Sequence, residues 1–280
     1  MGLVRISILT DNYATAYPFE ACQGFSALIE TENLNAIFDT GPNNMFSANA
    51  MKMQIELFGA DAIILSHGHY DHTGGIEKAL AVAPRATLYL SRKAMDEKFS
   101  RKNGRFKNVG IPERAKNTIS LAELENRVEF IEASKDISDA ITLFSIPGGR
   151  TQFYENWPFT TIAENGNEMS DRFEDELSML ISGKESSCLI AGCGHNGIDE
   201  MCKYAEKISG KPVSHIIGGS HTKEAPFPEI VKISRFFETR DTMLHLGHCT
   251  GIEGYCALSS ALPGKLRPLG TGLQIELDIR

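Results

Sequence analysis

The chain has 280 residues, of which 42% are hydrophobic and 23% are charged, and its formal net charge at pH 7 is −8. These proportions are typical of a soluble globular protein with enough apolar residues to bury a sizeable core. The negative charge argues against non-specific nucleic-acid binding, because that binding depends mainly on cationic contacts with phosphates.

The first half of the chain predicts a group of strands followed by an alternation of helices and strands. Short apolar runs separated by turn residues predict strands over the ranges 4–10, 25–30 and 36–39. The next expected elements are a helix near 44–58, a buried strand at 61–66, a helix at about 75–82 and a strand at 86–90.

The second half repeats this alternation. Strands are expected at 141–146, 160–163, 177–182, 187–191, 213–217, 242–246, 266–269 and 273–277, and helices near 198–209, 229–239 and 252–262. Strand clusters followed twice by such alternation predict a layered α/β architecture, with helices outside and sheets inside. Because no Pro-, Gly- or Ser-rich linker divides the chain, we expect one domain, 1–280, with two pseudo-repeated halves.

Residues 92–116 depart from the acidic composition, since they hold nine lysines and arginines against three acidic residues. One interpretation is a solvated helix and loop. The other is an insertion, about residues 92–118, that reaches over the active site and presents cations to an anionic, phosphorylated substrate. The candidate substrate-binding residues in it are Arg101, Lys102, Arg105 and Lys107.

The N-terminus and the cysteines favour a cytoplasmic protein. The segment 1–10 is too short and ends too polar for a signal peptide, and no apolar run approaches the ~18 residues of a membrane span. The six cysteines form no C-x-x-C pair, so we interpret them as reduced thiols that are mostly small buried hydrophobic residues. We therefore expect no membrane partner.

The strongest motif is L-S-H-G-H-Y-D-H-T-G-G at residues 65–75, directly after a predicted strand. It places His67, His69, Asp71 and His72 within six residues, where a glycine-containing loop can turn their side chains towards one point. Neutral imidazole and carboxylate groups are ligands that borderline-soft divalent ions take. A single histidine is more often structural, but four such groups at this spacing predict a metal centre.

This H-x-H-x-D-H motif resembles the signature of the metallo-β-lactamase superfamily. The resemblance implies a four-layer αββα sandwich and two divalent metal ions, with zinc preferred and manganese or iron as alternatives. It also implies that His67 and His69 bind one ion, and that Asp71 and His72 bind the other. The F-D-T-G turn at residues 38–41 is typical of the same family, in which Asp39 would orient the metal loop rather than bind the ion.

The later ligands depart from the family pattern. The family usually supplies a histidine from a Pro-Gly-His turn near mid-chain, but residues 146–150 read I-P-G-G-R. We expect His195 to replace that ligand and His248 to complete the set, because each follows a predicted strand in a glycine-containing turn. Asp175 and Cys193 are weaker candidates for a bridging or supporting group, and surface charge or a core thiol is the alternative.

Five segments occur in the order found in one branch of this family, the dihydropterin synthase-like proteins. They are T-D-N at 10–12, the motif at 65–75, G-C-G-H-N-G-I at 192–198, G-G-S-H-T at 218–222 and H-C-T-G at 248–251. The resemblance covers nearly the whole chain, and it implies formation of a dihydropterin–ribofuranosylaminobenzene phosphate conjugate. The glycines at 192–197 also fit a dinucleotide-binding motif, but the following strand lacks the acidic residue that such a site requires.

The sequence leaves three functions open. The preferred one is a metal-dependent hydrolase that uses a metal-bound hydroxide on a small anionic substrate, because His69 stands where a redox branch of the family has glutamate. A synthase at the same dinuclear site and a non-enzymatic metal-dependent binding or sensing module are the alternatives. Asp71 and His221 are the catalytic candidates, His221 as a donor to the substrate phosphate or leaving group. Tyr70 and His245 are lesser candidates, and acidity disfavours an RNA-processing nuclease.

Overall fold

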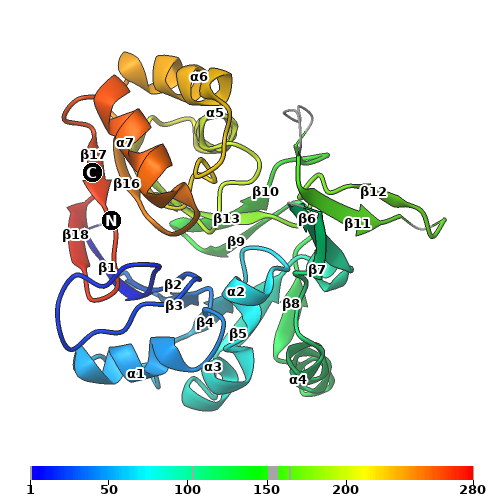
Figure 1. Cartoon of the computed structure of the whole chain (residues 1–280). Helices are drawn as coiled ribbons and strands as arrows, with labels where there is room; N and C mark the ends of the chain where they lie inside the picture. Colours follow the sequence, from blue (N-terminus) through cyan, green and yellow to red (C-terminus); the bar gives the residue numbers. More distant parts are fainter. Residues whose placement is uncertain (1, 103, 151–156, 164, 280) are drawn as a thin grey trace.

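The computed structural model describes residues 2–102, 104–150, 157–163 and 165–279. Its first large sheet has seven strands (Figure 1). In spatial order they are β18 (Gln274–Asp278), β1 (Leu3–Thr10), β2 (Ser26–Glu30), β3 (Asn35–Phe38), β4 (Ala62–Ile64), β5 (Thr87–Leu90) and β8 (Val128–Phe130). Helices α1 (Met45–Lys52), α3 (Ile76–Val82) and α4 (Glu113–Leu124) bury Phe46, Ile76 and Ile119 against one face of this sheet.

A second seven-stranded sheet is built from the other half of the chain. In spatial order its strands are β17 (Leu266–Pro268), β16 (Met243–Leu246), β15 (Val213–Gly218), β14 (Ser187–Ala191), β13 (Leu177–Ser182), β10 (Ile141–Ser145) and β9 (Ser134–Ser138). Helices α5 (Ile198–Ser209), α6 (Phe227–Glu238) and α7 (Gly251–Ala261) pack against its outer face. Figure 1 shows the helices of each half on opposite outer sides of the molecule.

The two large sheets face each other across one apolar core, to which Ile6 and Phe38 contribute from the first sheet and Met179 and Ile190 from the second. Strand β14 is buried along its whole length: Ile190 faces this inner core, whereas Leu189 packs against the outer helices. A strand covered on both faces has no solvent side to occupy with polar residues. The predicted αββα sandwich of two similar halves is confirmed.

The parallel strands of both halves end at one edge of the sandwich, and this placement brings the functional loops together. Strands β3, β4 and β5 are parallel to one another, as are β14, β15 and β16. The short elements α2 (Tyr70–Thr73) and η2 (His248–Thr250) follow β4 and β16 at these ends. In sheets of this kind, ligands bind beyond the carboxyl ends of the strands.

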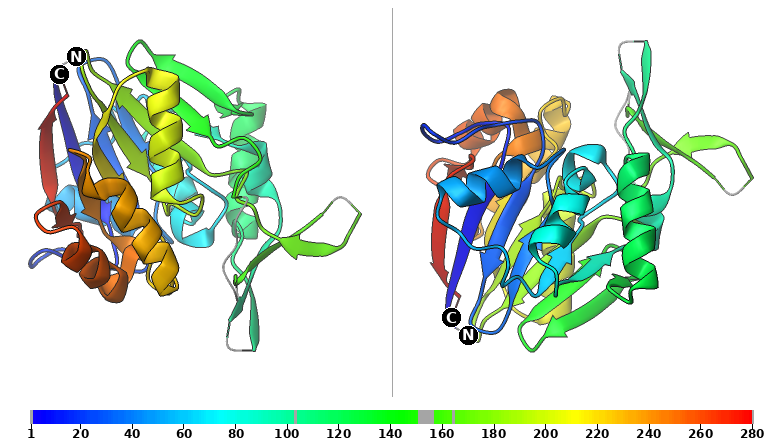
Figure 2. Two further views of the ribbon diagram at one scale, coloured as in Figure 1. Left: turned by 90° about the horizontal axis from the view of Figure 1, so that it is seen from above. Right: turned by 90° about the horizontal axis from the view of Figure 1, so that it is seen from below.

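The basic segment is not the solvated helix and loop of the first interpretation. It contains the short helix η1 (Arg92–Met95) and a hairpin of β6 (Lys98–Lys102) and β7 (Arg105–Asn108), and only then does α4 begin. Strand β6 pairs with β11 (Phe159–Ile162), which pairs with β12 (Glu168–Ser170), so that the two hairpins make a four-stranded sheet. Figure 2 shows both hairpins projecting from the body of the molecule.

Other boundaries also differ from the sequence prediction. The helix expected near 44–58 ends at Lys52, and turns follow at residues 53–54 and 58–59. Helix α4 was not predicted, because it buries only Ala115, Ile119 and Ala122 and leaves Leu121 and Leu124 exposed. Within the described residues, no helix is both long and apolar enough to cross a membrane.

Candidate metal centre

The loop between β4 and α2 carries four of the predicted ligands into the interior. His67, His69, Asp71 and His72 are all buried. The turn depends on Gly68, because a Cβ atom there would lie only 2.2 Å from the carbonyl oxygen of Ala94. The sequence therefore places a glycine where the backbone has no room for a side chain.

One group of ligand atoms belongs to His67, His69 and His195, and these atoms lie within 4.8 Å of one another. Within the described part of the chain, no hydrogen-bond partner meets Nε2 of His67, Nε2 of His69 or either ring nitrogen of His195. Burial lowers the pKa of all three imidazoles well below the usual range, which keeps them neutral. Buried nitrogen atoms without partners are costly, so this group fits a metal ion that would use their lone pairs.

A second group comprises Asp71, His72 and His248. The Nε2 atoms of His72 and His248 are 3.0 Å apart, and Nε2 of His248 lies 4.0 Å from Oδ2 of Asp71. Burial acts to raise the pKa of Asp71, but neighbouring histidines, His72 first, lower it to about 2. The carboxylate form that a cation requires is thus maintained. Together the two groups contain every metal ligand expected from the sequence.

Cys193 lies between these groups. Its Sγ atom is 3.2 Å from Nε2 of His72. It is within 4.8 Å of ligand atoms of His67 and His72 and, in a separate set, of those of His248 and Cys249. The sequence analysis ranked this cysteine low as a candidate, but its position suits a ligand shared by two ions. Cys249, which donates a hydrogen bond from Sγ to the carbonyl of Cys193 at 3.1 Å, was missed despite following His248 directly.

Asp39 supports the second group, as the resemblance implied. Its Oδ2 atom lies 2.7 Å from Nδ1 of His72 and accepts a hydrogen bond from Oγ of Ser66 at 2.7 Å, and its Oδ1 accepts the backbone N–H of Ser66 at 2.7 Å. Burial acts to lower the pKa of His72, but the carboxylate of Asp39 raises it to about 9. The contact fixes the ring so that Nε2 faces the site.

Asp175 supports the metal loop and is not among the groups of potential ligands found in the described residues. Its Oδ2 accepts the backbone N–H of Gly68 at 2.9 Å, and its Oδ1 accepts a hydrogen bond from Nζ of Lys98 at 2.9 Å. Further supporting residues were not singled out from the sequence. Gln23 donates a hydrogen bond to Asp71 at 3.2 Å, and Asn12 contacts His248. Only Asn12, within the T-D-N segment, carried a sequence signal.

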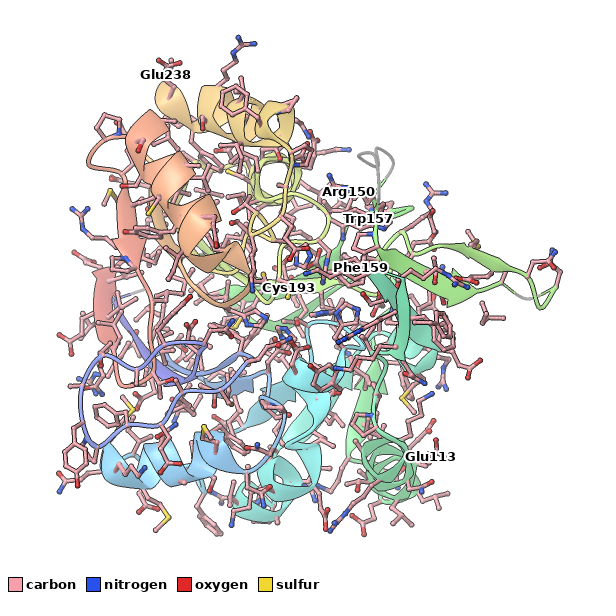
Figure 3. The ribbon with its side chains drawn as sticks, viewed as in Figure 1. Glu113, Arg150, Trp157, Phe159, Cys193 and Glu238 are labelled. Carbon is pink, nitrogen blue, oxygen red and sulfur yellow. The ribbon has the colours of Figure 1, made fainter. Side chains whose placement is uncertain are left out.

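A cavity of about 710 Å³ opens onto both groups. Four candidate ligands lie in its wall: His69, Asp71, Cys193 and His248. His221 and Phe159 also line it. Figure 3 shows Phe159 and Cys193 in the central region of the molecule, between its two halves. The concave shape and the polar groups in its wall are typical of a site that binds a small ligand.

The cavity wall contains three of the four predicted substrate-binding cations, Lys102, Arg105 and Lys107, together with Lys223. Lys102 forms an ion pair with Glu224. The structure does not bring Arg101 to this wall, because its Nε donates to Glu168 at 2.7 Å on the other face of the hairpin strand. Lys223 was missed, since it lies far from the basic segment in the sequence.

The catalytic candidates differ in their positions. The ring of His221 lies 4.2 Å from that of His195, and its Nδ1 is buried without a hydrogen-bond partner among the described residues. Its ligand atom is within 4.8 Å of those of Cys193 and His195, so it borders the ligand set. Tyr70 lines the cavity, whereas His245 pairs with His215 at 3.3 Å and is not part of that wall.

Comparison with known proteins identifies the family. Residues 19–150 match the family model of the metallo-beta-lactamase superfamily. An uncharacterised protein of Methanocaldococcus jannaschii is 32% identical over 256 residues, which cover 91% of this chain and 93% of the relative. The chain belongs to the metallo-beta-lactamase superfamily. A crystal structure of a metal-dependent hydrolase from this superfamily superposes with a TM-score of 0.80 at 28% identity, covering 98% of this chain and 99% of the other.

A second relative within the metallo-beta-lactamase superfamily bears a functional name. The M. jannaschii 7,8-dihydropterin-6-methyl-4-(beta-D-ribofuranosyl)-aminobenzene-5'-phosphate synthase is 28% identical over 280 aligned positions, covering 89% of this chain and 88% of the relative. The predicted resemblance to this branch is confirmed.

Proposed function

We propose that this metallo-beta-lactamase-fold protein is a metal-dependent hydrolase of a small anionic substrate, with phosphorylated compounds as the preferred class. The observation that carries the proposal is the set of buried imidazole nitrogens of His67, His69 and His195, which lack partners among the described residues and adjoin a second group of ligands. Residues of both groups also line the cavity.

The residues present fit two divalent ions. His67, His69 and His195 would hold the first, and Asp71, His72 and His248 the second, with Cys193 shared between them. We propose zinc as the native metal, because a thiolate among imidazoles suits zinc better than a hard cation such as Mg²⁺. Two such ions would supply Lewis acidity and a water of lowered pKa.

The protein's own groups would bind and orient the substrate. Neither Arg105 nor Lys223 forms an ion pair within the described ranges, and Lys107 contacts only the Tyr70 hydroxyl oxygen, at 3.2 Å, and its ring. These cations can therefore bind an anionic group in the cavity without first breaking a salt bridge. His221, which lines the cavity, would donate a hydrogen bond or proton to the leaving group.

Turnover of generic substrates by the zinc- and manganese-loaded protein tests this proposal. We expect hydrolysis of a phosphodiester, a phosphomonoester or a lactone. In His67→Ala and in His72→Ala, activity should be lost together with one of the two ions. Lys135→Met, which alters an exposed lysine paired with Glu129, serves as a control that preserves activity and both ions. Full turnover by either histidine variant would contradict the assignment.

A synthase is the second candidate, favoured by the 28% identity with the named dihydropterin synthase over 89% of this chain. The same ions and the same cavity would then promote group transfer rather than transfer to water. Product analysis after incubation with a dihydropterin diphosphate and a ribofuranosylaminobenzene phosphate separates the two functions. A joined product without hydrolysis of the generic esters would replace the hydrolase assignment.

A further inference from the structure

The segment 171–176, which joins β12 to β13, contacts both loops that carry the first group of ligands. Asp175 accepts the N–H of Gly68, the residue between His67 and His69, at 2.9 Å. Glu176 accepts the backbone N–H groups of His195 and Asn196, each at 2.8 Å. Two adjacent carboxylates thus hold two loops that are far apart in the sequence.

Phe173 contacts the first group directly. Its ring stacks on that of His195, with centroids 3.7 Å apart and planes 7° from parallel, and meets the ring of His69 edge-on at 5.4 Å. The backbone of Phe173 has φ 51°, which disfavours any residue with a Cβ atom. Its N–H donates to Oδ1 of Asp171 at 2.8 Å, and this bond helps to hold the unfavourable conformation.

Lys98 makes this arrangement electrostatically possible. Its side chain is 3% exposed, and Nζ donates to Asp171 at 2.8 Å and to Asp175 at 2.9 Å. Burial acts to lower the pKa of Lys98, but Asp175 and Asp171 raise it overall, so the lysine remains charged. Without that charge, two buried carboxylates would face each other uncompensated. Lys98 therefore supports the metal loop rather than binding substrate, and it does not line the cavity.

The I-P-G-G-R turn, which lacks the family's usual histidine, packs against the same segment. The N–H of Arg150 donates to the carbonyl of Arg172 at 2.6 Å, and its Nη1 donates to the carbonyl of His195 at 2.8 Å. A Cβ atom at Gly149 would lie 2.1 Å from that Arg172 carbonyl, so the close approach requires glycine. The turn that supplies no ligand here instead supports the replacement ligand, His195.

The second group is supported from other parts of the chain. Asn12 lies 2.9 Å from Nδ1 of His248, Gln23 donates to Asp71 at 3.2 Å, and Asp39 contacts His72. Among the described residues, none of these hydrogen bonds involves the segment 171–176. The two halves of the centre therefore have separate supports, apart from Asp39, which also reaches His67 through Ser66.

We propose that residues 171–176 and Lys98 form a brace that sets the metal affinity of the His67–His69–His195 group and leaves that of the Asp71–His72–His248 group unchanged. Asp175, Glu176 and Lys98 are positioning residues in this proposal, since they contact ligand-bearing loops and not the ion. Outer contacts of this kind typically change metal affinity by about 10- to 100-fold. The inference rests on the proposed two-ion site but does not depend on the reaction that the site performs.

The test is calorimetric titration of the metal-free protein with Zn²⁺, together with elemental analysis. Wild type should bind two ions, and Glu176→Gln should lower the affinity for one of them at least about tenfold. Lys98→Met should act likewise, and Lys135→Met, which alters an exposed lysine paired with Glu129 outside the brace, should bind as wild type does. Asn12→Ala should also lower the affinity for one ion, but for the ion at the Asp71–His72–His248 group.

Combined variants identify which ion is affected. In a His67→Ala background, where the first group is already disabled, Glu176→Gln should leave the affinity for the remaining ion within about twofold. In a His248→Ala background the same change should weaken binding of the remaining ion at least about tenfold. Asp175→Asn, which can still accept the Gly68 N–H, provides a milder variant should Glu176→Gln fail to fold, as checked by circular dichroism.

Two outcomes overturn the brace: equal binding of two ions by wild type and both brace variants, or equal weakening in the two histidine backgrounds. Failure of the proposed function gives a different result, since wild type would then bind two ions with Glu176 dependence yet hydrolyse no ester or lactone. The calorimetric titration therefore tests the brace, and the turnover measurement tests the proposed function.

Discussion

Replacing Asp39 by asparagine tests how the structure prepares His72 for metal binding. The substitution keeps the size of the side chain and one carbonyl oxygen, which can still accept the N–H of Ser66. It removes the charge that lies 2.7 Å from Nδ1 of His72, and an amide nitrogen facing that ring would compete with it as a donor. The ring would then be free to turn away from the second group.

The expected loss of metal affinity follows from the position of Asp39, which contacts the ligand His72 but does not itself bind the ion. Losses of about 10- to 100-fold in metal affinity are typical of such changes, equivalent to about 1.4–2.7 kcal/mol. Competition with a chromogenic chelator measures the affinity. Asp61→Asn is the matched control, since it makes the same change in an exposed aspartate that accepts a backbone N–H, that of Asn35, away from the metal centre. Unchanged zinc affinity in Asp39→Asn would refute this reasoning.

The remaining predictions concern the substrate, the leaving group and pH. Lys107→Ala should raise KM for a phosphorylated substrate several-fold and leave KM for a neutral lactone unchanged. Arg101→Ala should change neither value, because Arg101 is paired with Glu168 and does not line the cavity. Steady-state kinetics checks both variants. His221→Gln should lower kcat by about 100-fold with metal content unchanged in elemental analysis, and a parallel loss of metal would make His221 a ligand instead. Burial, with His215 and Arg267 nearby, lowers the pKa of His245 to about 4. The unfolded chain therefore binds the extra proton first, so stability should fall as pH drops from about 6.5 to 4, by up to about 1.4 kcal/mol per pH unit. Urea unfolding of wild type and His245→Asn measures this, and equal pH dependence in both would contradict it.

The fold and the metal motif could be predicted because their signals are local. Most strands of the two large sheets are apolar runs bounded by turn residues, and the ligands from His67 to His72 fall within six residues. His195 and His248 could be inferred because parallel strands end at one edge of a sheet, which leads their following turns to one place.

The supporting residues could not be predicted, because their roles depend on contacts between distant segments. Glu176 resembles any acidic residue in a polar stretch, yet it is buried against the backbone of His195. Lys98 belongs to a run of basic residues and is the member that points inward. Of the projecting hairpins only β11 was expected, as the strand at 160–163. Strands β6, β7 and β12 were missed because charged and polar residues alternate there with few apolar ones, so no buried face is visible in the sequence. The single-domain organisation, the cytoplasmic location and the lack of nucleic-acid and membrane partners stay predictions.

Anomalous diffraction from crystals of the zinc-loaded protein tests the central claim most directly. We predict two peaks, one beside Nε2 of His67 and His69 and one beside Asp71 and Nε2 of His248, with the sulfur of Cys193 next to both. A map without a peak at either position, from protein that retains its activity, would contradict a metal-dependent function.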